Sequence, residues 1–247
     1  MTSVSPQRAA ARARRELKRL ARPAGEFDAR RYFRGDVDLR FYNIGTAAMR
    51  AFARSIHTAN RRDWSIDHAM ALASILIRDK HLEVKSVGIE VVARYRRDFQ
   101  PRLLPAWQRW LAQNCASNWA TTDAISGCLI GPLLVRHAEL VEGMRAWARH
   151  RNMWVRRAAA AGLIPAVRSG LGIDVAYDVA RQLHPDAHDL IQKAVGWLLR
   201  ETGKKDEARL ARYLRATGAS IPRTTVRYAI ERFPAATRRA LLADTRR

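Results

Sequence analysis

From Thr46 onward, apolar residues recur every three or four positions almost to the end of the chain. This period indicates amphipathic helices with one buried face. We predict helices over 46–57, 65–78, 82–97, 102–114, 118–133, 137–148, 152–168, 172–183, 187–202, 205–215, 222–232 and 235–245. Helix breakers fall between them at Pro101, Gly170, Gly172, Pro185, Gly203, Pro222 and Pro234. No segment joins a period-two pattern to a hairpin turn, so the predicted fold class is all-α.

Four of the predicted helices are copies of one pattern. The segments HLEVKSVGIEV, NWATTDAIS, MWVRRAAAAG and LIQKAVGWLL align on their apolar positions, and one position of each falls in a shared repeat slot. The slot holds Lys85, Asp123, Arg157 and Lys193, which are 38, 34 and 36 residues apart. This period is typical of helical-pair repeats, which bury their apolar faces by stacking. We therefore predict a curved α-solenoid whose second helices line a concave basic groove.

Two tryptophans share a helix face with slot residues. Trp119 precedes Asp123 by four residues, and Trp197 follows Lys193 by four, a spacing that places side chains one above the other. Three of the four slots hold a base and one holds an acid. Stacked repeats are expected to bring two indoles, a single carboxylate and the cations onto one concave surface.

The N-terminal 22 residues are basic rather than periodic, with seven bases and one acid on an Ala-rich background. Three interpretations compete: a helix that contacts the phosphate backbone, a frayed basic arm, and an organellar transit peptide. We favour a helix with a loose start, ended by Pro23 and Gly25. The predicted organisation is a basic N-terminal helix or arm over 1–25 and a single repeat domain over 26–247.

The charge favours a polyanionic partner. Lys and Arg number 45 against 23 Asp and Glu, for a net charge of +22 and a pI of about 11.4. Almost all of the bases are Arg, and a GC-rich genome exchanges Lys for Arg, but it does not create an excess of bases over acids. Such an imbalance attracts nucleic acid and opposes self-association, so we expect a DNA-binding monomer.

Several classes of chemistry lack their usual residues. The two cysteines, Cys115 and Cys128, form no zinc-type spacing, and the histidines are scattered, so we expect no metal. Gly-rich phosphate loops are absent, and we expect no cofactor. No apolar run is long enough to cross a membrane, so we expect a soluble protein without a membrane partner.

The slot residues suggest chemistry on a cation. An exposed Trp stacks on bases and attracts positive charge through its ring face. A carboxylate facing phosphates is unfavourable unless it has a task. Glycosidic cleavage passes through an oxocarbenium-like state that carboxylates stabilise, and an alkylated purine is already a cationic leaving group. Two indoles and one carboxylate around a deoxyribose would stabilise that state.

Simpler structural interpretations stay open for each residue taken alone. Trp119 could be a core residue at a helix start, Asp123 could pair with a neighbouring Arg, and Arg156 with Arg157 could be a solvated face. The other tryptophans are interpreted as core or interhelix residues: Trp64, Trp107, Trp110, Trp147 and Trp154. Only the shared register favours a functional site over these interpretations.

At these residues the chain resembles the AlkD family of bacterial DNA alkylation repair proteins, which are HEAT-like-repeat DNA glycosylases. The resemblance rests on WATTD from Trp119, WVRRAA from Trp154 and, most specifically, IQKAVGWLLRE from Ile191. A weaker likeness lies in YFR from Tyr32 and FYNIG from Phe41. It covers about residues 26–235. One departure is Asn118, where the family often has a second aromatic residue; another is the long Arg-rich N-terminus.

The resemblance implies a bacterial cytoplasmic enzyme that hydrolyses the N-glycosidic bond of cationic N3- and N7-alkylpurines in duplex DNA without base flipping. By motif match, Trp119 and Trp197 would contact the deoxyribose through their ring faces, and Asp123 would stabilise the oxocarbenium and orient water. Arg157 would hold a backbone phosphate, and Tyr32 would reach the DNA. The bases Lys85, Arg156 and Lys193 complete the expected DNA-binding set.

Two other functions remain open. One is a non-catalytic DNA-binding relative that recognises damaged or branched DNA, although all four matched site residues are present in this chain. The other is a protein–protein adaptor built from HEAT repeats, which would favour an acidic or apolar inner face over Lys85, Arg157 and Lys193. Lesion preference, including any preference for bulky adducts, does not follow from the sequence.

Overall fold

The computed structural model describes residues 4–25, 33 and 38–246, and all regular secondary structure in this part is helical. The only pairing of extended backbone there is an isolated bridge between Arg40 and His81. The all-α prediction is therefore confirmed. The chain packs as two compact units, Met1–Leu129 and Ile130–Arg247, and each is described by itself. A single functional domain over 26–247 stays a prediction.

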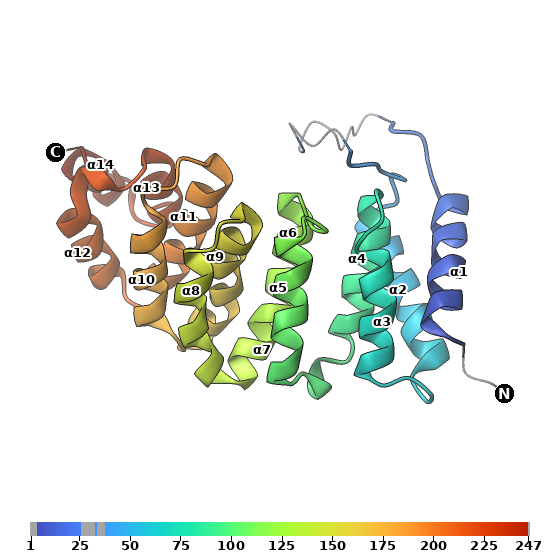
Figure 1. Cartoon of the computed structure of the whole chain (residues 1–247). Coiled ribbons are helices and arrows are strands. Elements are labelled where there is room, and N and C mark those ends of the chain that lie inside the picture. The colour runs from blue at the N-terminus through green and yellow to red at the C-terminus, as the bar shows by residue number, and fades with distance from the viewer. Residues whose placement is uncertain (1–3, 26–32, 34–37, 247) are drawn as a thin grey trace. The chain divides into compact units, whose positions relative to one another are not determined.

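The first unit begins with the predicted N-terminal helix (Figure 1). Its helices are α1 (Pro6–Arg19), α2 (Thr46–Asn60), α3 (Ile66–Leu76), α4 (Leu82–Ala93), α5 (Leu104–Ala112) and α6 (Trp119–Ile125). Helix α4 packs against α2, α3 and α6, while α1 packs against α3 and α4. The basic N-terminus is thus an ordered helix attached to the first unit.

The second unit stacks helices in pairs. Its helices are α7 (Gly131–Arg136), α8 (Met144–Ala148), α9 (Met153–Arg168), α10 (Ile173–Leu183), α11 (Asp189–Gly203), α12 (Glu207–Thr217), α13 (Arg223–Ala229) and α14 (Ala235–Asp244). Helices α8 and α10 lie side by side, as do α9, α11 and α13; α8 packs on α9, α10 packs on α11, and α12 packs on α11 and α14. The slot residues all lie on second helices: α4, α6, α9 and α11.

Most predicted helices are confirmed with ends shifted by a few residues. The main difference is the predicted helix 118–133, which begins as α6, widens into a π-helical turn at Ser126–Ile130 and continues as α7. The start of predicted helix 137–148 is a 3₁₀ turn, Ala138–Gly143. Of the tryptophans interpreted as core residues, Trp154 alone is half-buried, and Trp64, Trp107, Trp110 and Trp147 are buried.

Polar contacts connect successive helix pairs at the repeat spacing. Arg145 of α8 donates to Asp178 of α10 at 2.9 and 2.8 Å, and Arg168 of α9 donates to Glu201 of α11 at 3.0 Å. Both pairs are 33 residues apart. Glu201 is 2% exposed; burial alone would raise its pKa, but the bonds from Arg168 and Lys204 outweigh burial and lower it. Arg145 and Arg168 therefore link successive helix pairs, while the side chain of Arg168 stays 54% exposed.

Glycine permits the close approach of α11 and α13. A Cβ atom on Gly196 would lie 2.4 Å from the Cβ of Tyr228 and 2.8 Å from the carbonyl oxygen of Thr225. The hydroxyl of Thr225 donates across the same contact to the carbonyl of Gln192 at 3.0 Å. Because one of these neighbours is backbone, the helices would have to separate to admit a methyl group.

We expect Gly196→Ala to destabilise the fold by about 1–3 kcal/mol, since overpacking here outweighs the helix propensity gained from Ala. Gly143→Ala is the matched control, because a Cβ atom there meets nothing within 4 Å. Urea unfolding followed by circular dichroism measures both. Equal stability of the two variants would show that the α11–α13 contact is looser than described.

Candidate functional site

Helix α6 positions the first pair of candidate residues. It begins at Trp119, and the side chain of Asn118 caps it by accepting from the backbone N–H of Thr121 at 2.8 Å. Thr121, Thr122 and Ile125 are buried, which leaves Trp119 and Asp123 half-buried on the other side of the helix. The predicted shared face of Trp119 and Asp123 is therefore confirmed. Asn118, a departure from the family pattern, serves as a helix cap.

Two hydroxyl groups fix the inner side of this turn. Thr122 donates to the carbonyl of Ala116 at 2.9 Å, and Ser126 donates to the carbonyl of Thr122 at 2.8 Å. The π-helical turn Ser126–Ile130 starts directly after α6. Single π turns inside helices occur often at functional sites, because they re-aim neighbouring side chains. The carboxylate of Asp123 thus lies on a short, capped and distorted helix.

An aromatic residue from the N-terminal segment covers part of Trp119. The rings of Phe33 and Trp119 are stacked with centroids 5.2 Å apart and an interplanar angle of 9°. Phe33 also lies 5.3 Å from the ring of Phe41. In the sequence both rings belong to the weaker likeness, in YFR and FYNIG, and the pattern gave neither a role. Phe33 is therefore a candidate positioning residue for the indole.

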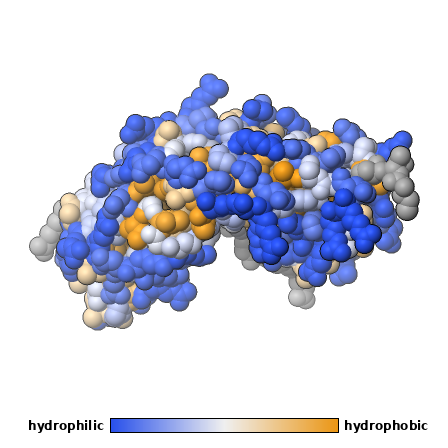
Figure 2. Space-filling model, turned by 90° about the horizontal axis from the view of Figure 1, so that it is seen from below, coloured by the Kyte–Doolittle hydropathy of each residue, from blue (hydrophilic) through white to orange (hydrophobic). Residues whose placement is uncertain are grey.

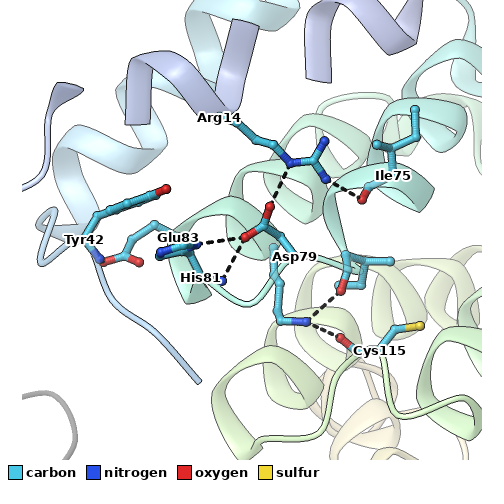
Figure 3. Close-up of polar contacts among 9 residues, drawn as sticks. Arg14, Tyr42, Ile75, Asp79, His81, Glu83 and Cys115 are labelled. Atoms are coloured by element: carbon cyan, nitrogen blue, oxygen red, sulfur yellow. Dashed lines mark hydrogen bonds and ion pairs between the residues drawn. The ribbon is translucent and has the colours of Figure 1, made fainter. Parts of the chain in front are cut away.

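The segment that carries Phe41 is anchored to α4. Glu83, buried in the first turn of α4, accepts from the backbone N–H groups of Tyr42 at 3.0 Å and Ile44 at 3.3 Å. The ring of Tyr42 stacks on His81 with centroids 4.0 Å apart (Figure 3). Asn43 adopts a positive φ of 56°, which Asn tolerates better than most residues. The segment FYNIG thus has a structural role in holding the entry to α2.

Helix α11 carries the second pair of candidate residues. Lys193 and Trp197 are both half-buried and lie one turn apart, which confirms their predicted shared face. The ammonium of Lys193 lies 2.6 Å from the carboxylate of Asp189, and this bond raises the pKa of Lys193. The lysine therefore stays charged at neutral pH while its side chain is 38% exposed.

Arg156 and Arg157 of α9 differ in environment. Arg157 is 5% exposed, and its guanidinium donates to the carbonyl of Leu190 in the first turn of α11. Arg156 is half-buried; it donates to Asp186 at 2.7 Å and to the carbonyls of His150 and Arg151. Arg157 thus holds the start of α11, while Arg156 secures the loop before that helix.

Lys85 is buried, contrary to the expected groove position. It is 7% exposed, and its ammonium donates to the carbonyl of Ile77 at 2.8 Å and to that of Cys115 at 2.7 Å. These carbonyls follow the ends of α3 and α5, where helices leave acceptors unsatisfied. Its helix is apolar on several sides, so the pattern alone did not distinguish an interior lysine from a surface one. We leave Lys85 out of the DNA-contacting set.

The candidate residues fall into two groups. Trp119 and Asp123 lie together in the first unit, whereas Arg156, Arg157, Lys193 and Trp197 lie in the second. Tyr32 lies outside the described residues. In the described part of the chain, no helix is long and apolar enough to cross a membrane, and no three His, Cys, Asp or Glu side chains gather as a metal site would require. Figure 2 shows hydrophilic residues covering most of the face seen from below.

The fold and the paired candidate residues define a protein of stacked helix pairs with a carboxylate and indoles on its second helices. Residues 13–233 match the family model described as DNA alkylation repair enzyme. The chain belongs to this DNA alkylation repair family. A search of curated proteins gave no match to the sequence.

Three solved structures share the fold. A predicted DNA alkylation repair enzyme from Enterococcus faecalis has a TM-score of 0.71 at 15% identity, covering 95% of this chain and 99% of that one. AlkD2 from Streptococcus mutans has a TM-score of 0.62 at 14% identity, covering 94% and 100%. The protein smu.31 from Streptococcus mutans UA159 has a TM-score of 0.53 at 13% identity, covering 81% and 91%.

We expect the Phe33–Trp119 stack to contribute measurable coupling. A double-mutant cycle of Phe33→Leu and Trp119→Leu, read by urea unfolding, should give a coupling energy of about 0.5–1.5 kcal/mol, as aromatic pairs do beyond the area they bury. A coupling energy near zero for Phe33 and Trp119 would refute the positioning role of Phe33.

Proposed function

We propose that this protein is a monofunctional DNA glycosylase that hydrolyses the N-glycosidic bond of cationic N3- and N7-alkylpurines in duplex DNA without base flipping. The observation that carries the proposal is the pair Trp119 and Asp123 on the first turns of α6. An indole and a carboxylate one turn apart are suited to a sugar cation, and both belong to a strongly basic chain of the DNA alkylation repair family.

The proposed reaction needs no strong acid. The bond between C1′ and the purine nitrogen breaks, and its electron pair moves to the nitrogen, which neutralises the cationic base. The deoxyribose becomes oxocarbenium-like, and the carboxylate of Asp123 and the ring face of Trp119 stabilise that charge. Water then adds to C1′ and loses a proton to Asp123 or to solvent, leaving an abasic site. Trp197 is proposed to act on the same sugar, for which the family resemblance is the support.

The bases of the second unit have separate proposed tasks. Lys193 and Arg156 are the more accessible of them and are proposed to contact DNA phosphates. Arg157, which bonds to Leu190, is proposed to keep α11 in place, so that any phosphate contact is secondary. Tyr32 stays in the DNA-binding set on the resemblance alone.

The proposed substrates are duplexes containing 3-methyladenine or 7-methylguanine. Bulky adducts are proposed as further substrates, because no closed pocket has to enclose the base. The protein is proposed to act as a monomer on bacterial cytoplasmic DNA. Its strong positive charge supports both proposals, since it opposes self-association and favours a polyanion.

Asp123→Asn tests the catalytic role of the carboxylate. We expect single-turnover release of 7-methylguanine to fall by at least about 100-fold, the scale of losing one electrostatic stabiliser of a transition state, while the melting temperature stays near wild type. Asp63→Asn removes the same charge from an exposed loop of the same unit and should leave excision unchanged. Wild-type excision by Asp123→Asn would overturn the assignment.

Lesion charge provides a second test. Neutral lesions such as uracil, hypoxanthine and 1,N6-ethenoadenine should be refractory, because the site supplies no evident acid to protonate the leaving base. Trp119→Leu and Trp197→Leu should slow release of cationic bases more than they weaken DNA binding, since their interaction grows as the oxocarbenium forms. Trp154→Leu on α9 is the matched control. Efficient uracil release, or losses confined to binding, would contradict the mechanism.

A further inference from the structure

Helix α1 has two contrasting faces. Ala9, Ala10, Ala13 and Leu17 are buried, and the helix packs with α3 and α4. On the opposite side, arginines recur at intervals of four, three and four residues, which places them in one row along the helix. This row is the α1 arginine stripe: Arg8, Arg12, Arg15 and Arg19, all exposed.

The helix is firmly attached rather than a frayed arm. Its N-terminus is capped by Ser5, and the indole N–H of Trp64 donates to the carbonyl of Val4 at 3.0 Å. In its middle, Arg14 donates to Asp79 at 2.7 Å and to the carbonyl of Ile75 at 3.2 Å, as Figure 3 shows. Beyond its C-terminus, the backbone N–H of Arg22 donates to the carbonyl of Tyr42 at 2.8 Å.

The anchor and the stripe use different arginines. Arg14 points sideways into the first unit, where Asp79 also accepts from the backbone and ring of His81. Burial would raise the pKa of Asp79, but these bonds and the one from Arg14 outweigh burial and lower that pKa. The Asp79 carboxylate that holds Arg14 is therefore ionised at neutral pH. The stripe can therefore change without removing the contact that holds α1.

The charges of the stripe work against the helix that bears them. Arg8 and Arg12 are four residues apart, as are Arg15 and Arg19, and like charges at this spacing destabilise a helix. The first turn holds Arg8 and no acid, which also opposes the helix dipole. Within the described residues, only Arg19 of the four has a carboxylate partner, Glu16 at 3.1 Å. A polyanion would relieve this repulsion.

We propose that the α1 arginine stripe is a docking surface for the phosphate backbone of duplex DNA, additional to the candidate residues on α6 and to those on α11. The proposal rests on DNA being the partner in the proposed function, but not on catalysis. The stripe extends over about 16 Å of helix at a rise of 1.5 Å per residue. A duplex carries about one charge per 1.7 Å, so several phosphates lie within that length.

A membrane surface fits this helix less well. Helices that lie in a bilayer interface insert large apolar side chains opposite their basic face. The apolar face of α1 consists mainly of Ala side chains, and it is already covered by α3 and α4. DNA requires only the exposed arginines, which are the residues that the fold leaves accessible.

The test removes two charges from the centre of the stripe in the full-length protein. Arg12→Gln/Arg15→Gln keeps good helix formers on an exposed face. Binding to lesion-free duplex across a KCl series should show a salt slope lower by about 1.8, which is about 0.9 for each lost phosphate contact. Arg12→Lys/Arg15→Lys should retain the wild-type slope, and single-turnover excision at saturating protein should be unchanged by either pair.

Arg238→Gln/Arg239→Gln on α14 removes the same charge from another exposed position and should leave the slope unchanged. Equal losses in both Gln pairs would mean a net-charge effect and overturn the proposal. An unchanged slope in Arg12→Gln/Arg15→Gln would also overturn the proposal. The same holds if this variant loses binding to vesicles containing phosphatidylserine but keeps wild-type binding to DNA. The binding test uses undamaged duplex, so it does not depend on catalysis. If the wild-type protein failed to excise lesions, the glycosylase proposal would be rejected, but the salt slopes would still test the stripe.

Discussion

The fold depends on basic side chains that satisfy backbone carbonyls where successive helix pairs meet. Lys85 binds the carbonyls of Ile77 and Cys115, and Arg157 binds that of Leu190, 33 residues further along the chain. Helix ends leave such acceptors without partners, and burying them unpaired is costly. A buried ammonium or guanidinium is in turn tolerated only when its donors are used. At these two positions a basic side chain joins neighbouring helix pairs within one unit, and part of the large positive charge belongs to the interior.

The need to satisfy these carbonyls shows how Asp123 on α6 differs from the basic residues in the same repeat slot. In the repeat slot, Lys85 and Arg157 connect repeats, and Lys193 pairs within its own helix, whereas the equivalent position on α6 holds Asp123. A carboxylate cannot donate to a carbonyl, so α6 cannot use the same contact. The helix is instead short, capped by Asn118 and secured by Thr122 and Ser126 before it widens into a π turn. The acidic slot on α6 therefore lacks the carbonyl contact that Lys85 and Arg157 make in the same position of their helices.

The helices and their paired faces could be predicted because periodicity reports which side of a helix is apolar. Periodicity does not report how deeply a residue is buried. Lys85 and Lys193 occupy the same repeat slot, yet Lys85 is buried and Lys193 is half-buried. The Phe33–Trp119 stack depends on a long-range fold of the N-terminal segment, which no local pattern reports. Packing also accounts for part of the specific string from Ile191, since Gly196 permits the α13 contact and Glu201 binds Arg168. The roles of Trp119, Asp123 and Trp197 in catalysis stay predictions.

The central claim is that this chain cleaves, rather than only binds, alkylated DNA. The direct measurement is the release of free base from methylated duplex DNA by the purified full-length protein, with abasic sites counted in parallel. The account predicts time-dependent release of 7-methylguanine and 3-methyladenine, matched by an equal number of abasic sites in an intact phosphate backbone. Tight binding to the same duplex without base release would contradict it and would identify a non-catalytic DNA-binding relative.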